Sequence, residues 1–427
     1  MQVFNLTSLN TSQEVPRSMY KPINITDECI YLEKILITLD DTWSNGIWAY
    51  NLAMNKMHRI DQGQHVEYAD LYDIDTPTMH WNGTTKLDPD FMYFATITEL
   101  KDEDYIEFYE IDLISGTQKN ILGFKFDKDS LLYKNMEVLA TGYILFRLSY
   151  DMELSETDFF DVLYLIDVKE RKYYEIMDEE FKINYGQRII IGEGEEAKIV
   201  FDQYFLSEEE QYDMLTSEDI ELIFDLPENI EENMLHKNAI KMTNLKDFID
   251  EIKSGKEELT FEIIDEIEEE GSIRIIGETA ENIYYKKKYY DFALREKGDF
   301  LSLRQIGSYQ VHKINKKTLE KTFIRNVHGD IEVKTNLNRA YTVTPQNKVI
   351  KIQDFDTDET IYTYKKRYIG KAQEEVIEFA NDEYLVIGLE STESLKTMRY
   401  MIVDAFTDEI IIIGSDVLLL QDYLFIV

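Results

Sequence analysis

Residues 108–121 read FYEIDLISGTQKNI, an apolar-rich run that ends in Asp112, followed by a short polar turn and a second apolar run. An Asp or Asn side chain at the end of a strand accepts hydrogen bonds from backbone N–H groups just ahead of it and so starts a turn. The flanking Ile, Tyr and Phe residues favour paired strands. This stretch therefore predicts a β-hairpin.

The same layout returns along the chain, with an apolar residue at the fourth position and Asp, Asn or Gln at the fifth. The further copies are IWAYNLAMNKMHRI (47–60), LYLIDVKERKYYEI (163–176), VHKINKKTLEKTFI (311–324), VIKIQDFDTDETIY (349–362) and YMIVDAFTDEIIII (400–413). The fifth position holds Asp112, Asn51, Asp167, Asn315, Gln353 and Asp404. We interpret each copy as the hairpin of two outer strands in a small antiparallel sheet.

Two additional stretches fit this layout. MQVFNLTSLNTSQE (1–14) places Asn5 at the fifth position, and ELIFDLPENIEENM (221–234) places Asp225 there. The second is ambiguous, because its acidic flanks would also suit a helix.

Most copies follow two more strand-like runs, such as MEVLA and YILFRLSY (136–140 and 143–150). Four short strands repeating at roughly 40–60 residues are typical of a β-propeller blade. The C-terminal runs at 416–420 and 423–427 have no hairpin after them. The hairpin at 1–14 would supply one and close the ring without an open edge.

We therefore predict an all-β fold, with residues 1–427 forming one closed β-propeller of four-stranded antiparallel blades. The count is eight blades if the 221–234 copy is a hairpin and seven if it is not. The chain resembles the β-propeller superfamily over nearly its whole length, and its hairpins resemble those of bacterial quinoprotein-like or TolB-like propellers. It has no WD dipeptide with a GH partner and no kelch double glycine, so the resemblance stops at the superfamily.

Residues 236–271 interrupt the repeat. Within them Leu245, Phe248, Ile249 and Ile252 recur at helical spacing, after Asn244 as a candidate N-cap. We expect a short helix near 236–256 in an insertion between blades. It would either bind a partner or stabilise an irregular blade.

The chain carries 84 acidic and 45 basic residues, a net charge of −39. That charge repels nucleic-acid phosphates and anionic membranes, and it suits a basic partner. The single cysteine, Cys29, excludes an intrachain disulfide. The first ten residues lack the basic and apolar regions of a signal peptide, so we expect a cytoplasmic protein.

Motifs for catalysis are missing from the sequence: it contains no G-x-S-x-G, no phosphate-binding loop and no H-E-x-x-H. The acidic stretch DFDTDET (354–360) has Glu359 where a calcium loop needs Gly, so we expect a plain turn. We predict no catalytic residues, metal site or cofactor. Because a propeller can assemble a site from distant loops, catalysis is disfavoured rather than excluded.

Two groups of residues are candidates for binding, each with ordinary packing or solvation as the alternative. Trp43 and Trp81 would lie in rim loops and could stack on a sugar, a base or a peptide, and His65 could join them. Lys365, Lys366 and Arg367, with Arg325 and His328 in another loop between blades, could form a cationic sector.

These features favour a non-catalytic propeller that binds another macromolecule, a protein, through its loop-bearing face. One alternative is an enzyme or a binder of a small, carbohydrate-like ligand that uses the central channel. Two carboxylates about 5–10 Å apart beside Trp43 or Trp81 would support that alternative. A third possibility is an acidic mimic of nucleic acid.

Overall fold

The computed structural model describes most of the chain in segments. These are residues 2–5, 17–26, 28–37, 42–60, 65–68, 91–99, 103–112, 117–127, 131–151, 159–178, 181–182, 185–203, 238–267, 271–289, 295–296, 301–302, 308–328, 331–336, 338–346, 348–367, 373–391, 397–414, 417–420 and 423–426. The candidate hairpin at 221–234 lies outside them.

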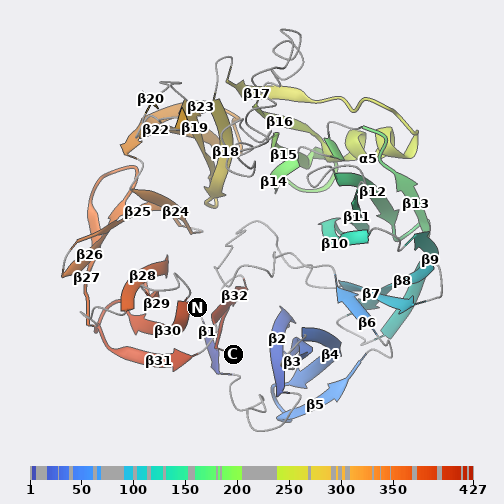
Figure 1. The fold of residues 1–427 in the computed structure, drawn as a ribbon, viewed down its shortest axis with the longest axis horizontal. Helices are drawn as coiled ribbons and strands as arrows, with labels where there is room; N and C mark the ends of the chain where they lie inside the picture. The colour runs from blue at the N-terminus through green and yellow to red at the C-terminus, as the bar shows by residue number, and fades with distance from the viewer. Residues whose placement is uncertain are drawn as a thin grey trace. The chain divides into compact units, whose positions relative to one another are not determined.

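Seven four-stranded antiparallel sheets follow one another along the chain, and in each the strands neighbour one another in chain order (Figure 1). The first three are β2 (Arg17–Ile25), β3 (Cys29–Ile37), β4 (Thr42–Asn51) and β5 (Lys56–Arg59); β6 (His65–Tyr68), β7 (Phe91–Glu99), β8 (Glu103–Asp112) and β9 (Thr117–Asp127); and β10 (Leu131–Ala140), β11 (Tyr143–Asp151), β12 (Phe159–Asp167) and β13 (Lys172–Glu175).

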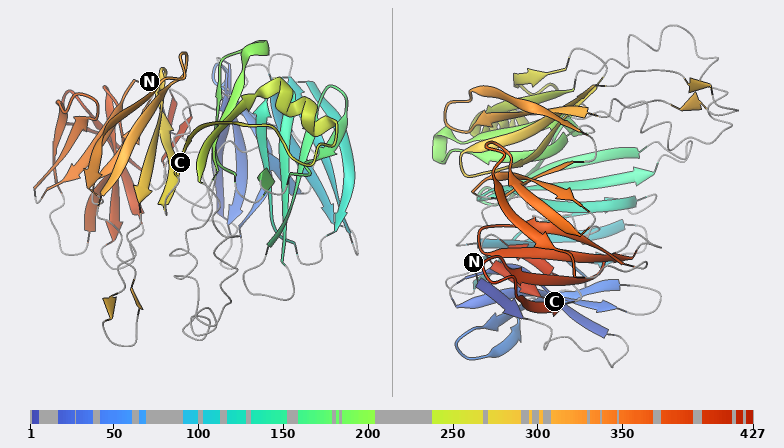
Figure 2. Two further views of the ribbon diagram at one scale, coloured as in Figure 1. Left: turned by 90° about the horizontal axis from the view of Figure 1, so that it is seen from above. Right: turned by 90° about the vertical axis from the view of Figure 1, so that its left-hand side faces the viewer.

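The other four sheets have the same order. They are β14 (Tyr185–Ile191), β15 (Lys198–Gln203), β16 (Ala239–Asn244) and β17 (Glu262–Glu266); β18 (Gly271–Glu278), β19 (Asn282–Tyr289), β22 (Ser308–Asn315) and β23 (Lys321–His328); β24 (Glu332–Thr335), β25 (Ala340–Pro345), β26 (Val349–Asp354) and β27 (Thr360–Lys365); and β28 (Gln373–Ala380), β29 (Tyr384–Ser391), β30 (Thr397–Asp404) and β31 (Ile410–Gly414). Figure 2 shows the strands of each sheet lying side by side.

This is the blade architecture of a β-propeller, and the prediction of an all-β propeller is confirmed, with seven four-stranded blades. Two compact units divide the chain: residues 1–176, 345–350 and 364–427 form one, and residues 177–344 and 351–363 form the other. A two-stranded ribbon, β20 (Arg295–Glu296) and β21 (Leu301–Ser302), lies between β19 and β22 in the sequence.

The ends of the chain meet in a separate three-stranded sheet within the first unit. β33 (Tyr423–Ile426) pairs with β32 (Val417–Leu420) on one side and with β1 (Gln2–Asn5) on the other. The β1–β33 pairing is parallel, whereas a blade of the expected kind would pair them antiparallel. Residues 6–14 lie outside the described chain, so closure by a hairpin at 1–14 stays a prediction.

The turn between the third and fourth strands has the chemistry that the repeat predicts. The Oδ1 atom of Asn315 accepts the N–H groups of Lys317 and Thr318 at 3.0 and 2.9 Å. Asp404 does the same for Phe406 and Thr407, both at 2.8 Å. The fourth residue after the Asp or Asn has a left-handed backbone in five of these turns: Asn55, Arg171, Leu319, Asp358 and Asp408.

One copy of the repeat has to be shifted by one residue. The sequence alignment put Gln353 at the turn position, but the side chain that starts this turn is that of Asp354. Its Oδ1 accepts the N–H groups of Asp356 and Thr357 at 3.0 and 2.9 Å. Gln353 instead donates from Nε2 to the carbonyl oxygen of Asp358 at 3.2 Å.

Asp354→Ala should therefore lower the free energy of unfolding by about 1–2 kcal/mol, because two backbone N–H groups lose their acceptor. Gln353→Ala, one residue away, should change it by less than about 0.5 kcal/mol. Urea unfolding followed by circular dichroism measures both. Equal effects of the two substitutions would contradict the assignment of Asp354 as the turn residue.

Helix α5 (Leu245–Lys253) confirms the predicted helix, and Asn244 caps it by accepting the N–H groups of Lys246 and Asp247. We expected the insertion to lie between blades, but α5 connects β16 to β17, which are neighbouring strands of one sheet. Phe248 of the helix packs against Phe181, with ring centroids 5.2 Å apart. The buried face of α5 thus covers part of its own blade.

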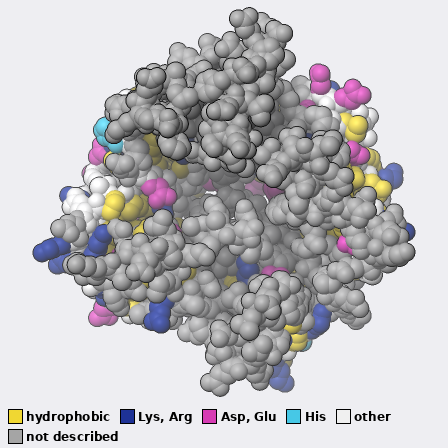
Figure 3. All heavy atoms as spheres, viewed as in Figure 1, with side chains coloured by type: hydrophobic (Ala, Val, Ile, Leu, Met, Phe, Trp, Pro, Cys, Tyr) yellow, Lys and Arg dark blue, Asp and Glu magenta, His cyan; other side chains and the backbone are white. Residues whose placement is uncertain are grey.

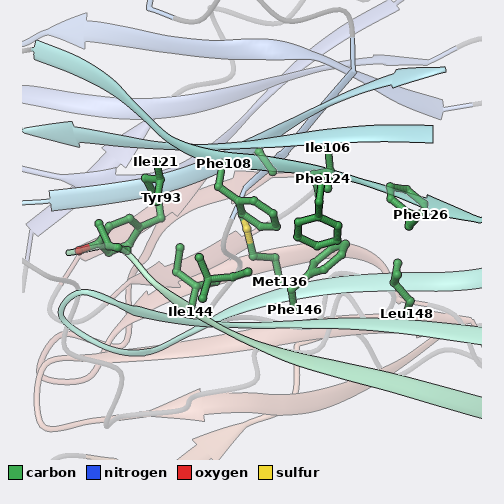
Figure 4. Packing of buried hydrophobic residues seen from close by; sticks show 13 residues of the cluster. Tyr93, Ile106, Phe108, Ile121, Phe124, Phe126, Met136, Ile144, Phe146 and Leu148 are labelled. Atoms are coloured by element: carbon green, nitrogen blue, oxygen red, sulfur yellow. The ribbon is translucent and has the colours of Figure 1, made fainter. Parts of the chain in front are cut away.

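Aromatic and aliphatic side chains fill the space between consecutive sheets. Between the sheet of β6–β9 and the sheet of β10–β13, Phe108 stacks on Phe124 and meets Phe146 edge-on, at 5.9 and 5.3 Å between ring centroids (Figure 4). Met136 fills the gap beside these rings. These apolar side chains join the two blades.

Candidate functional site

The described part of the structure does not show Trp43, Trp81 and His65 lying together. We expected Trp43 in a loop, but it lies in β4, where it pairs with Leu36 of β3. His65 begins β6 and pairs with Ile97. Trp81 lies outside the described chain, so a site that joins it to Trp43 or His65 stays a prediction.

Arg325 and His328 also lie in a strand, β23, and not in the loop where we expected them. The guanidinium of Arg325 forms an ion pair with Asp358 and donates to the carbonyl oxygen of Phe355 at 2.7 Å. It also lies over the Phe355 ring, 4.2 Å from the centroid. His328 is exposed at the end of the strand.

Lys365 ends β27, and Lys366 and Arg367 follow it. The guanidinium of Arg367 forms an ion pair with the Asp408 carboxylate at 3.3 Å and also hydrogen-bonds the Asp408 carbonyl oxygen. The backbone N–H of Arg367 donates to the buried carboxylate of Glu375 at 3.0 Å.

The two arginines play the same structural role. Arg325 lies in the last strand of one sheet, and Arg367 lies just beyond the last strand of another. Each binds an aspartate with a left-handed backbone, Asp358 or Asp408, in the turn of the next sheet. Both are engaged with an aspartate and with backbone oxygen, so they join neighbouring blades. Arg325 and Arg367 are each paired with an aspartate, so these two residues do not support the expected cationic sector. Figure 3 shows basic and acidic side chains of the described residues interspersed on the surface.

A further cluster of ionisable groups joins two blades of the second unit. Asp265 of β17 accepts the Tyr285 hydroxyl at 2.6 Å and forms ion pairs with Lys287 at 2.8 Å and Lys321 at 3.3 Å. Burial raises the pKa of Asp265, but the hydrogen bonds from Lys287 and Tyr285 outweigh it and hold the pKa below its usual range.

His312 completes this cluster, stacked on the Tyr285 ring with centroids 5.3 Å apart. Burial and the nearby Lys287 charge lower its pKa, which favours the neutral imidazole. Because one carboxylate is shared by two ammonium groups and a hydroxyl, the cluster acts as a cross-link between blades. Among the described residues, no group of three or more His, Cys, Asp or Glu could hold a metal ion.

The turn between β30 and β31 presents an exposed aromatic side chain. Phe406 is 81% exposed, the highest value among the large hydrophobic residues of the described chain. The equivalent positions in the four other described turns hold Ala53, Lys169, Lys317 and Asp356. The turn itself does not need Phe406, because Asp404 and Thr407 make its hydrogen bonds.

Acidic residues lie in the same turn as this aromatic side chain or in the neighbouring turn, and one of them, Asp408, is paired with Arg367. Asp408 and Glu409 follow it in the same turn. The neighbouring turn of the same sheet carries Asp382 and Glu383, and the carbonyl oxygen of Glu383 accepts the N–H of Ala405 at 2.8 Å. We call residues 382–383 and 404–409 the Phe406 surface.

No protein-family model matches the chain, and no curated protein matches its sequence. Similar solved structures include an oligogalacturonate lyase in complex with manganese, with 8% identity, coverage of 87% of this chain and 93% of that one, and a TM-score of 0.41. A polysaccharide lyase has 10% identity, coverage of 90% and 89%, and a TM-score of 0.36. TolB from Acinetobacter baumannii has 8% identity, coverage of 82% and 79%, and a TM-score of 0.27. Likenesses this distant do not assign an activity.

The Phe406 surface was missed from the sequence, although the signal was present. The second position after the turn-starting Asp or Asn holds one aromatic residue among six copies of the repeat: Ala53, Ile114, Lys169, Lys317, Asp356 and Phe406. The hydrogen bonds of the turn are made by the side chains of Asp404 and Thr407, so the side chain at position 406 is free to vary.

Proposed function

We propose that the protein is a non-catalytic, cytoplasmic β-propeller that binds a basic protein through the Phe406 surface. The observation that carries this proposal is the exposure of Phe406, the one aromatic side chain at its turn position among the six copies of the repeat. Aromatic residues are enriched among the residues that dominate binding energy in protein interfaces. A large apolar side chain in water gains free energy when a partner covers it.

Charge supports a basic partner in particular. The chain carries a net charge of −39, and Asp382, Glu383 and Glu409 lie in the surface in addition to Asp408, which is paired with Arg367. Oppositely charged partners associate faster and in a preferred orientation, and a cation placed over an aromatic ring gains additional attraction. A partner that presents Lys or Arg beside an apolar side chain would satisfy both features.

Photo-crosslinking tests this proposal. A benzophenone amino acid at position 406 should yield a discrete crosslinked protein in cells that express the chain naturally. The same probe at Thr318, in the equivalent polar turn, should not. Phe406→Ser should then weaken binding of the purified partner at least tenfold, and binding should weaken further as salt is raised. Identical products at positions 406 and 318, or none at 406, would contradict the proposal.

Exposure alone does not make a binding residue, and Met54 provides the matched control. Met54 lies in the equivalent turn between β4 and β5 and is 66% exposed, but Lys56 and Arg59 follow it in place of a flanking acidic run. Met54→Ser should leave the affinity of the purified partner within twofold of the wild-type value. An equal loss in both variants would indicate general surface hydrophobicity and not a defined site.

A further inference from the structure

β31 is the last strand of its sheet, and it pairs with β30 on one side. An edge strand presents backbone N–H and C=O groups that another strand can pair with, and proteins commonly discourage this with charged side chains. The last strands of the other six blades follow that rule, with Lys56, Lys125, Lys172, Glu262, Lys321 and Lys365. β31 reads IIIIG and contains no charge.

A second feature also distinguishes β31. Four of the last strands contain a bulge whose extra residue is an isoleucine: Ile121, Ile264, Ile324 and Ile411. The first three pack into the clusters between sheets. Ile411 is instead 42% exposed. The side chain that joins blades elsewhere is thus open to solvent beside an uncharged edge.

Phe406 lies five residues before Ile411, at the turn that leads into β31. The exposed aromatic side chain, the uncharged edge and the exposed isoleucine therefore all belong to one turn and the strand that follows it. A second copy of this chain would suit such an edge in shape, but each copy carries a net charge of −39, and two copies would repel each other.

We propose that β31 accepts an added β-strand from the partner, an extended segment in which apolar and basic residues alternate. Strand addition would use the backbone groups of β31 for affinity, with the apolar side chains of the segment covering Ile411 and Phe406. Its basic residues would face the carboxylates of the Phe406 surface. The inference rests on the proposed function and specifies how the partner binds.

The test uses a fluorescein-labelled, end-blocked octapeptide of alternating valine and lysine, titrated with the full chain and followed by anisotropy. Methylation of alternate backbone nitrogens of the peptide should weaken binding at least tenfold, because it removes N–H donors and keeps every charge. Ile411→Lys, which gives β31 the charge that other edges have, should weaken binding by a similar factor. Ile411→Val should stay within twofold of wild type.

Each other outcome overturns strand addition. Equal binding of the methylated and unmethylated peptides would assign recognition to side chains alone and leave the proposed function intact. Failure of the unmethylated peptide to bind would exclude this peptide class at β31, whereas failure of crosslinking at position 406 would contradict the proposed function itself. A dimer seen in sedimentation that Ile411→Lys abolishes would assign the edge to a second copy. The peptide comparison uses the wild-type protein, so it does not depend on the folding of a variant.

Discussion

Phe108→Ala should lower the free energy of unfolding by about 3–5 kcal/mol, the cost expected when a fully buried Phe is truncated in a core. Phe108 has no exposed surface. Its ring contacts Phe124 of its own sheet and Phe146 of the next sheet. Truncation would leave a cavity at the junction of two blades and remove two aromatic contacts, each worth about 0.5–1.5 kcal/mol beyond its buried area.

Urea unfolding and hydrogen exchange together measure this effect. Exchange protection should fall first in β8, β9 and β11, the strands that carry these three rings. Phe406→Ala is the matched control, since the same atoms are removed from a side chain that is 81% exposed. It should change the free energy of unfolding by less than about 0.5 kcal/mol. Similar losses in the two variants would show that the junction between these blades does not depend on Phe108.

Glu278→Gln should change how the stability of the protein depends on pH. Glu278 ends β18 with 1% of its surface exposed, and its carboxylate forms an ion pair with Lys316. Burial raises the pKa of Glu278 from 4.5 to about 7, against the opposing effect of the Lys316 charge. A carboxyl group with a raised pKa binds its proton more tightly in the folded protein than in the unfolded chain.

The direction of the effect follows from that difference. Between pH 4.5 and 7 the folded state holds a proton that the unfolded state has released, so this group's contribution to stability falls as the pH rises through this window. The full change is about 3 kcal/mol, from roughly 1.4 kcal/mol per pKa unit. Glutamine cannot ionise, so the variant should match wild type near pH 4 and exceed its stability at pH 8.

The measurement is the free energy of unfolding of both proteins between pH 4 and pH 8. Many carboxylates titrate in this range, so the informative quantity is the difference between variant and wild type. Glu281→Gln, which makes the same substitution at an exposed position in the adjacent turn, is the matched control. A constant difference for Glu278→Gln would mean that the buried carboxylate does not titrate in this window.

Local chemistry explains which parts of the fold could be predicted from the sequence. The strands and turns follow from short-range features, namely apolar runs and an Asp or Asn that captures backbone N–H groups ahead of it. Asn315 and Asp404 behave as predicted. The error at Gln353 arose because both Gln353 and Asp354 are polar, and only the pairing of β26 decides which of them ends the strand.

The candidate site was harder to predict, because it depends on contacts between segments far apart in the sequence. Arg325 and Arg367 looked like a cationic sector until their aspartates in the following blades were known. Trp43 was placed in a loop, and only the pairing of β4 with β3 shows that it lies in a strand. The helix was correctly predicted, but its place within one sheet depends on β16 and β17 pairing across it.

The repeat, the strand-rich fold and the turn chemistry could be predicted from the amino-acid sequence, since each depends on residues within about ten positions of one another. The number of four-stranded blades, the partners of the charged residues and the exposure of Phe406 and Ile411 could not be predicted in this way, because charge pairing and burial depend on which sheets pack together. A pattern of apolar and polar residues specifies a strand, and only its neighbours decide which side chains stay in water.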